Sequence, residues 1–196
     1  IAARIAERDG RIVIPSYDDP YIISGQGTAG LEIIEEARAL GFSFDGLITP
    51  IGGGGLCAGI CLAFEELSHG TKIFCAEPEH YNDHQLSLKA GVRTELKSGL
   101  PTLCDALMTP MPGELTFPIN SRVLSGAFAV SDQECLRAMA YAKRFLGVQC
   151  EPGGAAALAA LLSGALSSES SVETVCIVLS GGNVDPEIAA QADALI

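Results

Sequence analysis

The fold is decided by the stretch Leu47-Ile-Thr-Pro-Ile51-Gly-Gly-Gly-Gly55-Leu56, a short apolar run that ends in four consecutive glycines and continues into a helix-like segment. A strand that ends in glycines can wrap its backbone round a phosphate, because no side chains block the approach and N–H groups at the helix start point inward. The Lys-Ser or Lys-Thr pair of a nucleotide loop is absent, and the spacing is not Gly-x-Gly-x-x-Gly. The stretch therefore indicates either an anion cradle of another kind or a tight turn without a ligand.

Short apolar runs alternate with helical stretches along the chain, which predicts an α/β fold: an open, mostly parallel sheet with helices on both faces. The expected strands are 11–15, 46–51, 72–76 and 174–179. The expected helices are 28–40, 56–67, 131–146, 154–166 and 187–195, preceded by an amphipathic segment at 1–8. Residues 87–120 show no clear period and are interpreted as an irregular excursion. We expect one α/β domain over residues 1–196.

Composition excludes some classes of function. A formal charge of −12 without a cluster of Lys or Arg argues against a nucleic-acid surface. No apolar stretch approaches the ~20 residues of a membrane span, so we expect neither nucleic acid nor membrane as a partner, and a cytoplasmic location. The seven cysteines are an odd number among apolar neighbours, which indicates buried thiols in a reducing compartment and argues against disulfides or a zinc site.

A second glycine turn, Ser180-Gly181-Gly182, follows the last expected strand. In an open α/β sheet, the loops beyond the carboxyl ends of neighbouring strands line one crevice, so two such turns indicate one ligand with two polar ends. Between them along the chain, Glu151-Pro152-Gly153-Gly154 precedes a helix rich in alanine. Glu151 is either a residue of that crevice or a carboxylate placed at a helix start by the helix dipole.

Five patterns in this order resemble the fold-type II pyridoxal-phosphate enzymes, in the serine/threonine dehydratase and serine racemase branch. They are Ser24-Gly-Gln-Gly-Thr28, Gly52-Gly-Gly-Gly-Leu56, Ala76-Glu-Pro-Glu79, Glu151-Pro-Gly-Gly-Ala155 and Ser180-Gly-Gly-Asn-Val-Asp185. The resemblance implies that the amides of Gly52, Gly53, Gly54, Gly55 and Leu56 hold the phosphate of pyridoxal phosphate. It also implies that Ser180 faces the pyridine nitrogen, with Glu151 and Gly181 beside the cofactor.

The resemblance further implies a reaction. A neutral hydroxyl opposite the ring nitrogen is a weaker partner than a carboxylate, which suits elimination of a leaving group. The expected reaction is loss of water from serine, threonine or 3-hydroxyaspartate, giving a 2-oxo acid and ammonia, in an enzyme that is a homodimer. Two alternatives stay open: a racemase or β-replacement enzyme of the same fold, and a non-catalytic module that binds a phosphate or an amino acid.

A divalent cation is implied by the same resemblance. The segment Glu77-Pro-Glu-His-Tyr-Asn-Asp83 is similar to that of the dehydratases that carry Mg²⁺, Mn²⁺ or Ca²⁺. There the ligands would be the Glu77 and Asp83 carboxylates and the Tyr81 carbonyl, hard oxygen donors that suit these ions. The alternative is a pair of solvated loop carboxylates. His80 and His84 are interpreted as polar residues of the surface or of a pocket rim.

The chain also departs from the family pattern. Nothing matches the Ser-x-Lys-x-Arg-Gly motif of the Schiff-base lysine, and no catalytic residue is assigned, because the only lysines are Lys72, Lys89, Lys97 and Lys143. We therefore expect the carboxy-terminal portion of a longer enzyme, inactive by itself. Ala106 stands where many relatives have glycine, after Asp105, which is either a pocket residue or a turn residue. Gly153 stands where serine or threonine is frequent.

Overall fold

The computed structural model describes residues 1–97 and 100–195, and in that part it contains one four-stranded, all-parallel sheet. The strands are β1 (Gly46–Pro50), β2 (Lys72–Pro78), β3 (Leu124–Val130) and β4 (Val175–Ile177). They lie in the order β3-β2-β1-β4, so β1 pairs with both β2 and β4. The predicted α/β class is confirmed.

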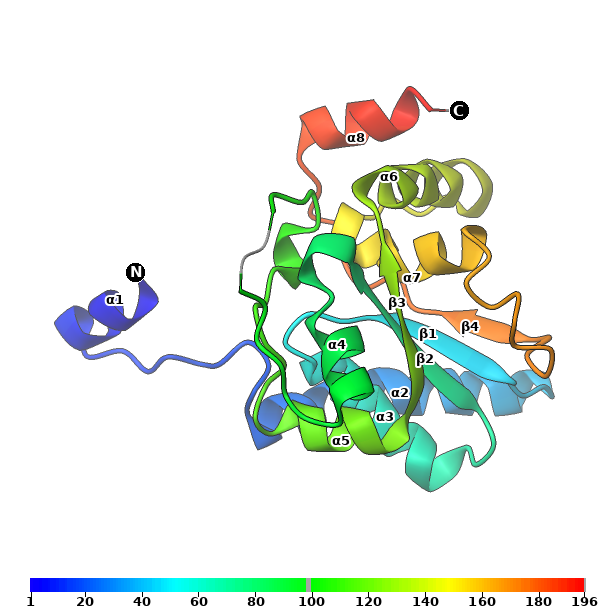
Figure 1. Ribbon diagram of the computed structural model, residues 1–196, viewed down its shortest axis with the longest axis horizontal. Coiled ribbons are helices and arrows are strands. Elements are labelled where there is room, and N and C mark those ends of the chain that lie inside the picture. Colours follow the sequence, from blue (N-terminus) through cyan, green and yellow to red (C-terminus); the bar gives the residue numbers. More distant parts are fainter. Residues whose placement is uncertain (98–99, 196) are drawn as a thin grey trace.

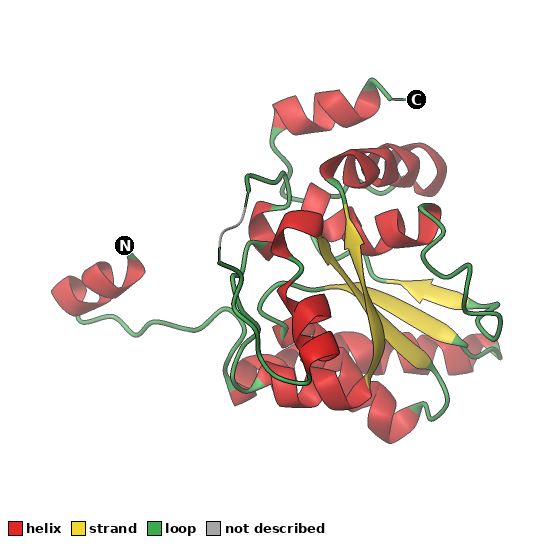
Figure 2. Cartoon of the chain, viewed as in Figure 1, coloured by secondary structure: helices red, strands yellow, loops and turns green. Residues whose placement is uncertain are grey.

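Helices cover both faces of the sheet, as Figure 1 shows. One layer contains α2 (Pro20–Leu40), α3 (Gly55–Leu67) and α5 (Thr116–Val123), and the other contains α6 (Asp132–Tyr141), α7 (Pro152–Leu162) and the outermost α8 (Pro186–Asp193). Helix α4 (Asp83–Ala90) lies against β3, whereas α1 (Ala2–Asp9) stands apart from the body at the end of an extended segment (Figure 2). The sheet is thus the middle of three layers.

Side chains that alternate along the strands build two cores. Leu47 and Ile73 join the cluster beneath α2 and α3, whereas Ile48 and Phe74 join the cluster with α6 and α7. All five residues of β1 are buried. Burial on both faces explains why this strand is an uninterrupted apolar run instead of an alternating one.

Helices α2 and α3 approach each other closely through glycine. A methyl group at Gly59 would lie 2.4 Å from the backbone nitrogen of Gly27, so only glycine allows this crossing. Helix α2 begins at Pro20 and not at residue 28 as expected. The Asp19 carboxylate accepts hydrogen bonds from the N–H groups of Tyr21 (2.8 Å) and Ile22 (3.2 Å), and proline occupies the first turn.

The expected strand at 11–15 is wrong, because these residues form no regular structure and pair with no strand in the described chain. Its apolar side chains are exposed, Ile12 at 91% and Ile14 at 75%. Conversely, β3 is a strand that the sequence did not reveal. It lies at the sheet edge, is half-buried, and consists largely of small residues in place of the β-branched residues typical of strands.

The other helix predictions hold with shifted ends. The capping box of Ser131 and Glu134 starts α6, but the α-helix ends at Tyr141 and widens into a π-helical turn, Ala142–Leu146. Helix α7 ends at Leu162 and not at 166, and α8 spans Pro186–Asp193. The irregular excursion expected at 87–120 is wrong in part, because its first residues belong to the last turn of α4 and its last residues to the beginning of α5.

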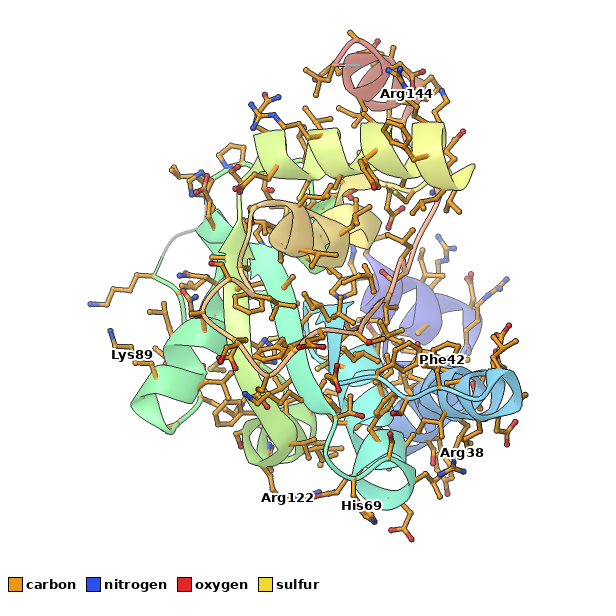
Figure 3. All side chains as sticks on the ribbon, turned by 90° about the vertical axis from the view of Figure 1, so that its right-hand side faces the viewer. Arg38, Phe42, His69, Lys89, Arg122 and Arg144 are labelled. Carbon is orange, nitrogen blue, oxygen red and sulfur yellow. The ribbon has the colours of Figure 1, made fainter. Side chains whose placement is uncertain are left out.

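The cysteines and the labelled basic side chains occupy different parts of the molecule. In the described residues, no helix is both long and apolar enough to cross a membrane. All seven cysteines are free thiols, and six of them are buried, as the sequence predicted. In Figure 3 the labelled Lys89, Arg122 and Arg144 lie at the periphery of the view, so these positive charges do not gather in one patch.

Candidate functional site

The glycine loop between β1 and α3 has the hydrogen-bonding pattern expected of an anion cradle. The carbonyl of Gly53 accepts from the Thr116 hydroxyl (2.7 Å) and from the Gly113 N–H (3.3 Å), and the carbonyl of Gly54 accepts from the Asn120 amide (3.3 Å). In the described chain, the N–H groups of residues 52–54 donate no hydrogen bond, and the first N–H groups of α3 have no partner within the helix. The loop therefore leaves its donors free for a ligand and directs its acceptors into the protein.

Gly54 is the residue that makes this arrangement possible. Its φ is +96°, a conformation that L side chains rarely adopt. A methyl group there would lie 2.6 Å from the Asn120 Nδ2, 2.9 Å from the Thr116 Oγ1 and 3.1 Å from the His84 Nε2. These three side chains are fully buried, so the loop rests on a packed polar base.

A cavity of about 230 Å³ opens above the loop. It is lined by Gly52, Gly53, Gly54, Gly55, Leu56, Tyr17, Ala106, Thr109, Ser180 and five further residues. The register explains why both glycine turns meet here, because Ile48 pairs with Ile177, and the two loops leave neighbouring strands at the same edge. The structure thus brings the predicted phosphate residues and Ser180 to one cavity.

Tyr17 and Asp18 belong to this site and were not found from the sequence. The Tyr17 ring lies over the loop, since a methyl group at Gly53 would overlap it at 2.3 Å. The Asp18 carboxylate accepts from the N–H groups of Glu114 and Leu115 at the start of α5, both at 2.8 Å. The sequence holds one signal for Asp18. Two aspartates precede Pro20, and because Asp19 alone caps α2, the second aspartate is available for another role.

Glu151 lies beside Gly181 but does not line the same cavity as the glycine loop. The Gly181 carbonyl accepts from the Glu151 N–H at 3.0 Å, and a methyl group at Gly181 would lie 2.5 Å from Glu151 Oε1. Glu151 and Asp105 line an adjoining cavity of about 380 Å³, while Ala106 lines the first. At the start of α7 the Glu151 side chain forms no capping hydrogen bond, so capping does not fix its position.

The two predicted metal carboxylates lie together beneath the site. Glu77, in β2, and Asp83, at the start of α4, are each 1% exposed, so they are not solvated loop residues. Burial raises the pKa of both carboxyl groups, Glu77 well above its usual range. The N–H groups of Gln85 and His84 oppose the upward shift at Glu77, and the neighbouring His84 ring opposes the shift at Asp83. Tyr81 ends a short 3-10 turn that connects them.

His84 corrects the sequence interpretation of a surface or rim residue. It is fully buried, and neither ring nitrogen has a hydrogen-bond partner in the described chain. One ligand atom each from Glu77, Asp83 and His84 lies within 4.8 Å of the others. The unpartnered Asp83 Oδ2 and imidazole nitrogens make this cluster fit a cation. His80, by contrast, is at the surface.

None of the four lysines lines the cavity above the glycine loop. Lys72 pairs with Glu169 (2.6 Å) and Lys143 pairs with Asp193 (2.6 Å). In the described chain, the cavity therefore offers N–H groups that can bind a phosphate and the Ser180 hydroxyl, but no lysine amine.

Fold and site together define a class: a parallel α/β protein with a glycine anion cradle at the carboxyl ends of its strands. The family model for pyridoxal-phosphate dependent enzymes matches residues 1–181. The chain belongs to this family, and its relatives place it in the serine/threonine dehydratase and serine racemase branch, as the sequence predicted.

Three curated relatives illustrate the likeness. The L-threo-3-hydroxyaspartate ammonia-lyase of Saccharomyces cerevisiae is 39% identical over 186 residues, 94% of this chain and 55% of the relative. The L-threonine dehydratase catabolic TdcB of Escherichia coli is 37% identical (93% and 54%), and the serine racemase of Dictyostelium discoideum is 36% identical (93% and 55%). The chain thus spans about half the length of these relatives.

Solved structures agree. A crystal structure of threonine deaminase from T.th. has a TM-score of 0.86 at 36% identity, and the match covers 94% of this chain and 61% of that one. The maize serine racemase has a TM-score of 0.87 at 34% identity, with coverages of 98% and 59%. Dehydratases and racemases therefore share this fold.

Proposed function

We propose that the protein to which this chain belongs is a pyridoxal-phosphate dependent ammonia-lyase that removes water from serine, threonine or 3-hydroxyaspartate. One observation carries the proposal: unpartnered N–H groups of the glycine loop and the Ser180 hydroxyl line a single cavity. Such a cavity suits a ligand with a phosphate at one end and a heteroatom at the other. Relatives with lyase activity by name support the reaction class.

Each residue has a role in this proposal. The N–H groups of Gly52, Gly53, Gly54, Gly55 and Leu56 bind the phosphate, aided by the positive end of α3. Ser180 donates or accepts a hydrogen bond at the ring nitrogen, while Glu151 and Gly181 border the ring. Pyridoxal phosphate, when bound, supplies the electron sink of the reaction. A neutral hydroxyl does not enforce a charged ring nitrogen, which favours elimination of a leaving group.

The amine that links covalently to the cofactor is proposed to come from outside these 196 residues. The lysines of the chain support this, because none lines the cavity and two are held in ion pairs elsewhere. The chain alone would then bind the phosphate without turnover. The exposed apolar residues at 12–14 are consistent with a surface covered by another segment or by the second subunit of a dimer.

A divalent cation, Mg²⁺, Mn²⁺ or Ca²⁺, is part of the proposal, with the Glu77 and Asp83 carboxylates and the Tyr81 carbonyl as ligands. Two carboxylates buried side by side can both stay charged only beside a counter-charge, which a cation would supply. In the described residues, no lysine or arginine forms an ion pair with either of them. The buried free thiols support a reducing compartment, and we extend the proposal to a cytoplasmic location.

Racemisation is the second candidate, because serine racemases from Dictyostelium discoideum and maize match this chain as well as the lyases do. A non-catalytic module is the third, supported by the missing amine. The products separate the three. A lyase releases 2-oxo acid and ammonia, a racemase interconverts L- and D-serine, and a module does neither.

The first test compares pyridoxal phosphate with pyridoxal, which lacks the phosphate. The chain has no tryptophan, so quenching of tyrosine emission, with Tyr17 at the cavity, reports binding. Two charge-assisted hydrogen bonds of about 1.5 kcal/mol each predict about a hundredfold preference for pyridoxal phosphate. Equal affinity for both compounds would overturn the cradle and the proposed function.

The second test measures products from the full-length gene product. Release of 2-oxo acid from one of the three hydroxy amino acids supports the lyase, and its absence together with formation of D-serine supports the racemase. Ser163→Ala, a substitution remote from the cavity, is the control for Ser180→Ala. Only the latter is expected to lower activity.

A further inference from the structure

Glu77, Asp83 and His84 form a carboxylate–histidine cluster that is closed to solvent, with exposures of 1%, 1% and 0%. Glu77 comes from the end of β2, and the other two residues come from the first turn of α4. One ligand atom of each lies within 4.8 Å of the others. The spacing is that of groups able to share one ion.

The oxygens of the cluster retain capacity for a ligand. Glu77 Oε2 accepts from the His84 N–H (3.0 Å) and Oε1 accepts from the Gln85 N–H (2.7 Å). These bonds fix the carboxylate in place and use one lone pair of each oxygen, which leaves the second free. Asp83 Oδ2 accepts no hydrogen bond from the described residues.

His84 is the unusual member, because both of its ring nitrogens are buried without a partner in the described chain. Its Nδ1 lies 3.5 Å from Asp83 Oδ2, yet the two atoms do not form a hydrogen bond. Its Nε2 lies on the opposite side, beneath Gly54 of the glycine loop. Leaving a buried polar group unpaired costs about 1–3 kcal/mol, so a bound ion at Nδ1 would remove a penalty that the cluster otherwise carries.

We propose that His84 binds the cation of this site directly through Nδ1, and that the site therefore selects first-row transition ions such as Mn²⁺ over Ca²⁺ and Mg²⁺. The inference rests on the cation of the proposed function and adds a ligand and a selectivity to it. An imidazole nitrogen is a softer donor than a carboxylate oxygen and favours the first-row transition ions, whose affinities rise along the series from Mn²⁺. Mn²⁺ is the hardest of them, so its preference over Mg²⁺ sets the lower limit of the selectivity. Coordination at Nδ1 leaves the proton on Nε2, facing the base of the glycine loop.

The selectivity has a spectroscopic test that does not depend on activity. Mn²⁺ is added to the full-length protein, and electron spin echo modulation reports whether a ¹⁴N nucleus is bound to the ion. The expected result is a nitrogen signal that changes to the ¹⁵N pattern when the protein is made with ¹⁵N-histidine. A bound Mn²⁺ without any nitrogen signal would overturn the inference.

Calorimetric titration of His84→Asn gives the second readout, with the exposed His69→Asn as the matched control. Mn²⁺ affinity is expected to fall at least about tenfold in His84→Asn, because even loss of a group that only orients a metal ligand costs about that much. Affinity for Mg²⁺ should change by less than the Mn²⁺ affinity, and His69→Asn should change neither. Equal losses for both ions would indicate a structural role and overturn the selectivity.

Two outcomes separate this inference from the function on which it rests. Binding of Mn²⁺ that is lost in Asp83→Asn but unchanged in His84→Asn would leave the cation site intact and overturn only the nitrogen ligand. No binding of any divalent ion by the wild type would overturn the cation site itself, and with it this inference. If His84→Asn fails to fold, the labelled wild-type spectrum still decides.

Discussion

Substitution of Gly54 by alanine tests the cradle most directly. Its φ of +96° is unfavourable for alanine, at a cost of about 1–2 kcal/mol. The added methyl group would also meet the Asn120 and Thr116 side chains at 2.6 and 2.9 Å. Both donate to carbonyls of the loop, so they cannot move away without losing those bonds. Overpacking of this kind adds about 1–3 kcal/mol, for a total of about 2–5 kcal/mol.

Gly70→Ala is a matched control, because Gly70 has a φ of +100° but nothing within 4 Å of an added methyl group. It carries the backbone cost alone. Urea unfolding of both variants should therefore give free energies of unfolding that differ by the overpacking contribution. In thermal unfolding, each kcal/mol should lower the Tm by about 2–4 °C for a chain of this size.

Binding provides the second half of this test. Gly54→Ala is expected to weaken pyridoxal phosphate binding, because the loop must shift to admit the methyl group, whereas Gly70→Ala is expected to leave it unchanged. Equal destabilisation by the two substitutions, together with unchanged affinity in both, would refute the reasoning. It would mean that the base of the loop is not the packed polar layer described above.

Three further predictions concern the surroundings of the site. Thr116→Val removes the 2.7 Å hydrogen bond to the Gly53 carbonyl and should cost about 1–3 kcal/mol in urea unfolding, with weaker phosphate binding in the same titration. Asp18→Ala frees the N–H groups that start α5 and should cost about 1–2 kcal/mol, a full capping contribution; unchanged stability would contradict it. Partial burial raises the pKa of Cys176 to about 11, so its thiol is neutral below that pH. Labelling by a disulfide reagent at pH 8 should be at least about a hundredfold slower than in urea, where the pKa is about 8.5; equal rates would contradict the burial.

The elements that the sequence predicted well are those whose own residues carry a clear signal, either apolar side chains that match the burial of the element or a capping pattern at its start. β1 is apolar throughout because both faces are covered, and α6 begins at a capping box. β3 escaped prediction because a half-buried edge strand of small residues has neither the alternation nor the β-branched content of a strand. The segment at 11–15 misled for the opposite reason, since it is β-branched but exposed and unpaired in the described chain.

The sequence by itself determined the glycine loop, since four glycines between a strand and a helix carry that geometry locally. Only the tertiary structure decided what supports it. Tyr17 and His84 reach the loop, and Asp18 reaches the start of α5, from segments remote in the chain, with α5 packed against α3 and α4 against β3. Local patterns encode backbone conformation. The burial of His84 beside Gly54 depends instead on how α4 packs beneath the glycine loop, and no short stretch of sequence encodes that packing.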